Sequence, residues 1–305
     1  MGHEHSHEPL PTSLTKFALL SVATALTTMG IKTVAAWLTG SISLLSDAAE
    51  SIINLVAAVV TLFALRLAAK PADEGHPFGH SKAEYLSAAV EGAMILVAAG
   101  AIIWAAIERL ITPRLPEQLG IGMLISVVAA LINGGVALVL IRAGRAHSSS
   151  ALVADGKHLM TDLVTTIAVL VGVGLVWLTG WAVLDPIVAI LAGLNILYTG
   201  YDLIRDSASS LLDAALGDED MTKVHAVLDA HLREGITYHA LRSRVAGTQR
   251  FLDLHISVPG EWSVAAGHAL AETLSDELST ALPRLQVSAH VEPSRPDGTC
   301  PDDAH

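Results

Sequence analysis

The stretch Ala154-Asp-Gly-Lys-His-Leu-Met-Thr-Asp162 begins an apolar segment that continues to Trp177. His158 and Asp162 are four residues apart, so a helix would place both side chains on one face, about 5–6 Å apart at Cβ. The segment is long enough to span a bilayer. A charged residue near the centre of a membrane helix costs about 2.5–3.5 kcal/mol or more. The pair therefore indicates a functional site inside the membrane.

The composition is that of a membrane protein. The 305 residues are 52% hydrophobic and 16% charged, with a mean hydropathy of +0.53. A soluble domain carries about 25% charged residues. The net charge of −12 argues against nucleic acid as a partner. With Cys300 as the one cysteine, the chain can form neither an intrachain disulfide nor a cysteine-based zinc site.

Six apolar segments predict six membrane-spanning helices within a transmembrane domain of residues 15–213. The segments cover residues 16–38, 43–67, 83–111, 118–142, 149–178 and 183–206. Lysine and arginine are concentrated in the connectors after the second and fourth segments, which predicts that both termini lie in the cytoplasm. We expect an integral membrane protein that contacts lipid in the inner (plasma) membrane of a bacterium.

Beyond Leu216-Gly-Asp-Glu-Asp220 the apolar runs shorten and charged residues become frequent. We therefore predict a cytoplasmic α+β domain over residues 214–293, with the element order α-β-β-α-β. Its predicted elements are a helix at 221–233, strands at 240–245 and 250–258, a helix at 263–282 with Ser263 as N-cap, and a strand at 285–292.

The two ends of the chain are polar. The start, Met-Gly-His-Glu-His-Ser-His-Glu, lacks the basic region of a secretory signal. We interpret residues 1–14 as a His-rich tail that either gathers metal weakly or has no function. Residues 294–305 are expected to be disordered.

The second predicted helix carries a polar pair of its own, Glu50 and Asn54, again four residues apart. If successive helices alternate in direction, Glu50 lies level with Asp162 and Asn54 lies level with His158. Four oxygen and nitrogen ligands would then converge, which is a set that zinc accepts. The alternative for Asn54 alone is a hydrogen bond between helices.

His158 suggests how such a site could work. Histidine has a reference pKa of about 6.5, so it can lose a proton when a divalent ion arrives and regain one when the ion leaves. Competition of metal and proton for one site, with access alternating between the two sides, predicts a metal/proton antiporter.

Three stretches of the chain resemble the signatures of the cation diffusion facilitator family. They are Ser41-Ile-Ser-Leu-Leu-Ser-Asp-Ala-Ala-Glu-Ser-Ile-Ile-Asn54, Pro71-Ala-Asp-Glu-Gly-His-Pro-Phe-Gly-His-Ser-Lys-Ala-Glu84 and the opening stretch. The resemblance covers the chain to about Pro293. It implies a homodimeric exporter of divalent transition metals, driven by proton influx, with six membrane helices and a metallochaperone-like cytoplasmic domain.

The transport site departs from the family pattern in its second-helix pair. Zinc-transporting relatives usually have His and Asp, or two Asp, where this chain has Glu50 and Asn54. An amide oxygen is a harder and weaker ligand for zinc than imidazole. Zinc is our first expectation for the ion, and iron, manganese, cobalt and cadmium are the alternatives.

The resemblance also implies two more metal sites and an ion pair. The loop site is Asp73, His76 and His80, for which a hydrogen-bonded polar turn is the alternative. Lys82 resembles a lysine that pairs with an acid after the sixth helix, here Asp213, although it could instead extend to the membrane surface. The regulatory cytoplasmic site comprises His239, His255, His268, His290 and Glu292, the last in place of the family's usual Asp.

Two other classes of function are compatible with a buried metal site. One is a membrane-embedded metalloenzyme, but the chain has no His-Glu-x-x-His pattern. The other is a metal sensor whose cytoplasmic domain carries the activity. We expect a secondary active transporter rather than an enzyme.

Overall fold

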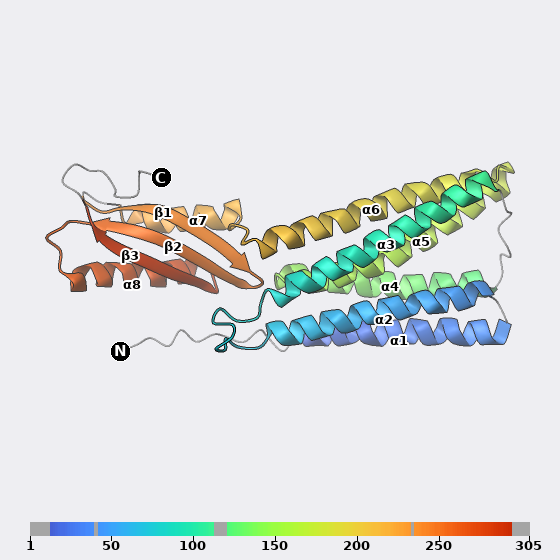
Figure 1. Cartoon of the computed structure of the whole chain (residues 1–305), viewed down its shortest axis with the longest axis horizontal. Coiled ribbons are helices and arrows are strands. Elements are labelled where there is room, and N and C mark those ends of the chain that lie inside the picture. The colour runs from blue at the N-terminus through green and yellow to red at the C-terminus, as the bar shows by residue number, and fades with distance from the viewer. Residues whose placement is uncertain (1–12, 40–41, 113–120, 233–234, 295–305) are drawn as a thin grey trace. The chain divides into compact units, whose positions relative to one another are not determined.

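The computed structural model describes residues 13–39, 42–112, 121–232 and 235–294 (Figure 1). Within these ranges, the side chains of residues 13, 39, 42–47, 49, 50, 121 and 122 are left out of the description. The two predicted tails therefore lie almost wholly outside it. The chain divides into two compact units, Met1–Ala208 and Ser209–His305, which are described separately below.

Among its described residues, the first unit consists of six long helices. Their bounds are α1 Ser13–Thr39, α2 Ile42–Ala68, α3 Ala83–Ile111, α4 Ile121–Ala146, α5 Ser150–Thr179 and α6 Leu184–Leu211. All six are long and apolar enough to cross a membrane, which confirms the six-helix prediction. Several run past the predicted ends, as α4 does to Ala146, because helical hydrogen bonding continues where the apolar pattern stops.

The fifth helix, α5, lies between two groups of helices (Figure 1). Leu152 and Leu159 pack into one buried cluster with residues of α1, α2 and α4. Ala154 packs into another cluster with residues of α3 and α6. The helix that carries His158 and Asp162 is therefore surrounded by protein over this stretch, where a polar side chain can find polar partners.

Glycines allow α4 and α5 to approach closely. A Cβ atom added to Gly134 of α4 would lie 2.6 Å from Leu163 Cδ2 of α5. A Cβ atom added to Gly156 of α5 would lie 2.7 Å from Ile141 Cγ1 of α4. The added atom on Gly156 would also lie 3.0 Å from the backbone carbonyl oxygen of Ala137, so this glycine sets the spacing of the two helices, whereas at Gly134 the neighbour is a flexible side chain. Close backbone approach through small residues is the usual packing mode of membrane helices.

Four tryptophans mark one end of the helical unit. Successive helices run in opposite directions, so α1, α3 and α5 end on the same side (Figure 1). Trp37, Trp104, Trp177 and Trp181 lie at or toward that end, and each is between 70% and 82% exposed. Tryptophan is enriched where a membrane meets water. This end of the unit is therefore suited to one membrane interface.

The second unit has the predicted α-β-β-α-β order. Its elements are α7 Asp218–Ala230, β1 Thr237–Ala246, β2 Gln249–Val258, α8 Val264–Ala281 and β3 Leu285–Pro293. Among the described residues the strands form one sheet in the order β1-β2-β3, with β1 antiparallel and β3 parallel to β2. The α+β prediction is confirmed, including Ser263 as the N-cap of α8.

The core of the second unit follows from the alternation in β2. Leu252, Leu254, Ile256 and Val258 are all buried and pack against α7 and α8. The residues between them lie on the other face of the sheet, because successive side chains of a strand point to opposite sides. That other face carries His255, so burial of the apolar face fixes which way the histidine points.

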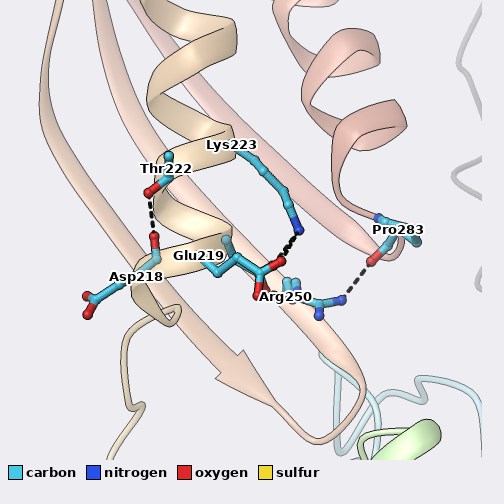
Figure 2. Close-up of polar contacts among 7 residues, drawn as sticks. Asp218, Glu219, Thr222, Lys223, Arg250 and Pro283 are labelled. Atoms are coloured by element: carbon cyan, nitrogen blue, oxygen red, sulfur yellow. Dashed lines mark hydrogen bonds and ion pairs between the residues drawn. The ribbon is translucent and has the colours of Figure 1, made fainter.

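Arg250 links the start of α7 to the sheet, and the polar contacts around it are drawn in Figure 2. Arg250 of β2 donates from Nε to Asp220 Oδ2 at 3.0 Å and from Nη1 to the carbonyl of Pro283 at 3.0 Å. The side chain of Lys223 contacts Glu219 one turn earlier, at 3.0 Å. Acidic side chains in the first turn of a helix also interact favourably with its dipole. Arg250 thus connects α7, β2 and the turn that precedes β3.

Candidate metal centres

Inside the helical unit, α2 and α5 bring three of the four predicted transport-site residues together. Asn54 donates from Nδ2 to Asp162 Oδ2 at 2.6 Å, and His158 Nε2 lies 3.0 Å from Asn54 Oδ1. Asn54 and His158 are each 4% exposed. We predicted Asn54 level with His158 in a convergent set, and the structure places it in contact with both His158 and Asp162.

The fourth predicted residue, Glu50, lies in α2 one turn before Asn54. Its side chain is outside the described residues, so its part in a four-ligand site stays a prediction. The i,i+4 spacing from Asn54 puts Glu50 on the same face of α2.

A residue that the sequence did not single out completes the described contacts. Asn133 of α4 donates from Nδ2 to Asp162 Oδ2 at 2.9 Å, so two amides share one carboxylate oxygen. Asn133 is 2% exposed. The available signal was a single asparagine in the apolar run of α4, followed directly by Gly134 and Gly135. That pattern indicates a contact between helices but not which helix is contacted.

Other buried polar side chains fix the helices around this site. Ser149 is the N-cap of α5, and its hydroxyl also donates to the carboxylate of Glu84 at the start of α3. Deeper in the unit, Thr61 of α2 donates to Glu91 Oε1 of α3 at 2.7 Å. These contacts tie α3 to α5 and α2, the helices that supply His158, Asp162 and Asn54. The Ser149 cap marks where α5 begins and hence how far His158 lies along it.

The connector between α2 and α3 brings Asp73, His76 and His80 together as predicted for the loop site. One ligand atom from each residue lies within 4.8 Å of the other two. The backbone amide of His76 donates to Asp73 Oδ1 at 2.7 Å and holds the pKa of that carboxyl below its usual value. Gly79 has φ +80°, a conformation that glycine adopts without strain. An exposed carboxylate beside two imidazoles can bind a divalent cation.

In the second unit, a row of side chains crosses the sheet at one level. His239 of β1 is paired with His255 of β2, which is paired with His290 of β3. Neighbouring imidazole rings along the row are 5.1 Å and 5.0 Å apart at their centres. Glu292 completes the cluster, with Oε1 3.2 Å from His239 Nε2 and Oε2 3.8 Å from His255 Nδ1. Ligand atoms of His239, His255 and Glu292 all lie within 4.8 Å of one another.

Two predicted interactions have a different outcome: one is not formed within the second unit, and the other would join the two units. The structure does not bring His268 of α8 into the cytoplasmic cluster, and its Nε2 lies 3.3 Å from Glu272 Oε1 one turn along the same helix. Asp213 Oδ1 lies 3.4 Å from Arg244 Nη1 of β1. The pairing of Asp213 with Lys82 would join the two units, and it stays a prediction.

The cytoplasmic cluster can be tested directly by removing its central ring. We expect His255→Ala to weaken zinc binding at this cluster at least about tenfold, equivalent to about 1.4 kcal/mol, because one of three ligands is lost. Calorimetric titration of the full-length protein in detergent measures the change. His231→Ala is the matched control, since His231 hydrogen-bonds to the carbonyl of Val227 outside the cluster. An unchanged set of zinc sites in His255→Ala would contradict the assignment.

Comparison with known proteins agrees with both units. Residues 18–212 match the family model for the cation efflux transmembrane domain, and residues 216–294 match the one for the cytoplasmic domain of cation efflux proteins. The protein belongs to the cation diffusion facilitator family. The family resemblance stated from the three sequence motifs is therefore confirmed. As a cation diffusion facilitator with six apolar helices, the chain is an integral membrane protein.

Curated relatives of this cation diffusion facilitator align along nearly its full length. The uncharacterized transporter sll1263 of Synechocystis is 45% identical over 277 residues, covering 91% of this chain and 89% of the relative. The cation-efflux pump FieF of Klebsiella pneumoniae is 31% identical over 284 residues, covering 92% of this chain and 93% of the pump.

Among solved structures, the metal-bound C-terminal domain of the CzcD transporter from Thermotoga maritima is 28% identical. The match covers 25% of this chain and 87% of that chain, with a TM-score of 0.23.

Proposed function

We propose that this protein exports a divalent transition-metal ion from the cytoplasm in exchange for protons, with zinc as the first candidate. The ion would bind between α2 and α5, at Glu50, Asn54, His158 and Asp162, and the site would open alternately to either side. The observation that carries the proposal is the contact of Asn54 with both His158 and Asp162 inside the membrane unit. Efflux is supported by family membership and by the FieF pump among the relatives.

The hydrogen bonds of the described site support competition between metal and proton. Asn54 Oδ1 can only accept a hydrogen bond, so His158 Nε2 carries a proton when it bonds to this oxygen. An ion that used the same nitrogen would have to displace that proton, because a metal binds an unprotonated ring nitrogen. A neutral ring would keep its proton by moving it to Nδ1, so a proton leaves the site only when the metal-free ring is an imidazolium with both nitrogens protonated. The proposed exchange is therefore between a doubly protonated, metal-free ring and a neutral, metal-bound ring. Exchange of the two at one atom is the chemical basis of antiport.

Charge balance supports a divalent ion. Glu50 and Asp162 together supply two negative charges, and the amide and the neutral imidazole supply none. A divalent cation would therefore leave the occupied site neutral, which lowers the cost of carrying it through the membrane interior. Oxygen donors outnumber nitrogen donors in this set, so iron, manganese, cobalt and cadmium remain alternatives to zinc.

We propose in addition that the second unit senses metal. Zinc bound by the His239–His255–Glu292 cluster, with His290 beside it, would favour a homodimer of cytoplasmic domains and thereby bias the membrane unit. The matched cytoplasmic domain model, named for dimerisation, supports this assembly. In this arrangement residues 15–213 form the transmembrane domain in a bacterial inner membrane, residues 214–293 form the regulatory domain, and both termini are cytoplasmic.

Reconstituted proteoliposomes test the exchange. With a pH-sensitive dye inside the vesicles, external zinc should drive proton movement that saturates with zinc concentration and runs opposite to zinc. Iron, manganese, cobalt and cadmium should be compared in the same preparation. Metal binding without any saturable flux would contradict the transporter assignment and would leave the sensor as the better description.

A further inference from the structure

We propose that Asn133 of α4 is a selectivity-determining residue of the transport site, which would make that site the product of three helices rather than two. In the metal-free state its amide nitrogen positions Asp162, and with an ion bound its carbonyl oxygen becomes a ligand. The inference rests on the proposed function and names what sets the choice of ion at that site.

The first observation is the shared oxygen. Asn133 and Asn54 both donate to Asp162 Oδ2, at 2.9 Å and 2.6 Å. The two amides approach from α4 and α2, while Asp162 is on α5. The carboxylate is therefore held by partners on two of the helices that pack against α5, and any ion that takes this oxygen must displace two N–H groups.

The second observation is an unmet acceptor. Asn133 Oδ1 is buried and has no hydrogen-bond partner among the described residues. A buried carbonyl without a partner costs free energy, and the cost is greater where no water can reach it. An apolar side chain of the same shape would avoid this cost. The presence of a polar residue here is accounted for if an ion binds this oxygen in another state of the protein.

The third observation is a close contact between α4 and α5 directly beside Asn133. Its neighbour Gly134 is in close contact with Leu163, the residue after Asp162, where an added Cβ would lie 2.6 Å from Leu163 Cδ2. The two contacts are adjacent along both helices. The glycine thus lets α4 and α5 lie close together beside Asp162, and rotation of the Asn133 amide about its side-chain bonds is enough to present Oδ1 in place of Nδ2.

An added amide oxygen has a definite effect on ion choice. Zinc favours four ligands in a tetrahedron and takes nitrogen readily. Manganese prefers oxygen donors and a larger, six-coordinate shell. Because an amide is neutral, Asn133 raises the number of oxygen ligands without changing the charge of the site. It should therefore favour manganese relative to zinc.

Substitution by leucine, which has a similar shape, removes both polar atoms. In proteoliposomes, we expect Asn133→Leu to raise the KM for manganese about tenfold and the KM for zinc by less than about threefold. Asn133→Asp keeps an oxygen ligand but loses the N–H donor, so it should restore manganese transport while changing its pH dependence. Asn195→Leu is the matched control, because Asn195 is an exposed asparagine of α6 and should change neither ion.

Binding measurements keep this test independent of transport. Calorimetry with zinc and manganese in a background that lacks the other clusters, Asp73→Ala and His255→Ala, should show the same shift in affinity ratio for Asn133→Leu. A manganese-to-zinc ratio equal to that of the parent protein would overturn the inference, as would a loss of manganese affinity that Asn133→Asp does not restore. If binding shifts but no variant transports, the proposed function fails and the role of Asn133 stands.

Discussion

Zinc-driven proton flux should fall to the level of empty vesicles in His158→Ala. The substitution removes the nitrogen at which we propose that metal and proton exchange, and it leaves Asn54 Oδ1 without the hydrogen bond at 3.0 Å that the structure gives it. An alanine at this position can neither bind the ion nor carry a proton. The measurement is the initial rate of internal pH change after zinc addition, normalised to the amount of folded protein in the vesicles.

His147→Ala is the control for this experiment. His147 lies just beyond α4, and its Nδ1 contacts the carbonyl of Ala143 one turn earlier, so the substitution removes a histidine without touching the site. The control should transport at close to the parent rate. Proton flux that persisted in His158→Ala at the rate of the His147→Ala control would show that the exchange takes place elsewhere.

The second large effect concerns the contact of α4 with α5. We expect Gly156→Ala to lower the free energy of unfolding by about 1–3 kcal/mol, the usual cost of forcing a methyl group into a packed interior. The added Cβ would lie 2.7 Å from Ile141 Cγ1 and 3.0 Å from the carbonyl oxygen of Ala137. The latter is backbone, so relief requires the helices to separate. Because His158 follows two residues later, transport should fall as well.

Gly174→Ala in the same helix is the matched control, and it should raise the free energy of unfolding where Gly156→Ala lowers it. Nothing lies within 4 Å of a Cβ added there. Replacing glycine by alanine inside a helix then stabilises by about 0.5–1 kcal/mol. Thermal unfolding of the detergent-solubilised protein measures both variants. Equal midpoints for the two alanines would show that the glycine at 156 does not set the helix spacing.

The sequence predicted helices and strands well wherever one physical signal dominated. Long apolar runs predicted all six membrane helices, and alternation predicted β2 because Leu252, Leu254 and Ile256 are buried while Asp253 and His255 between them are not. The start of β1 was placed at Ala240 instead of Thr237. The structure explains this miss, because Ala240 has φ +50° and the strand register shifts between His239 and Arg242, which interrupts the alternation.

The site was predictable in part. The spacing of four residues places His158 and Asp162 on one helix face, whatever the helix packs against. Which residues of other helices meet that face depends on packing, which the spacing does not encode. Asn54 was therefore identified as a site residue level with His158, but its hydrogen bond to Asp162 was not predicted. Asn133 was missed because its position follows from the contact of Gly134 with Leu163.

The exposed tryptophans restrict the kind of motion that can carry an ion across. An indole ring is most stable at the boundary of hydrocarbon and water. Moving a helix along the membrane normal, like a piston, would drag Trp37 or Trp177 out of that boundary. Tilting about the same end keeps both rings at their depth while it displaces residues near the opposite end. If the site opens alternately to the two sides as proposed, we expect the helices to pivot about the tryptophan end, with larger displacements at the end of the Asp73–His80 connector.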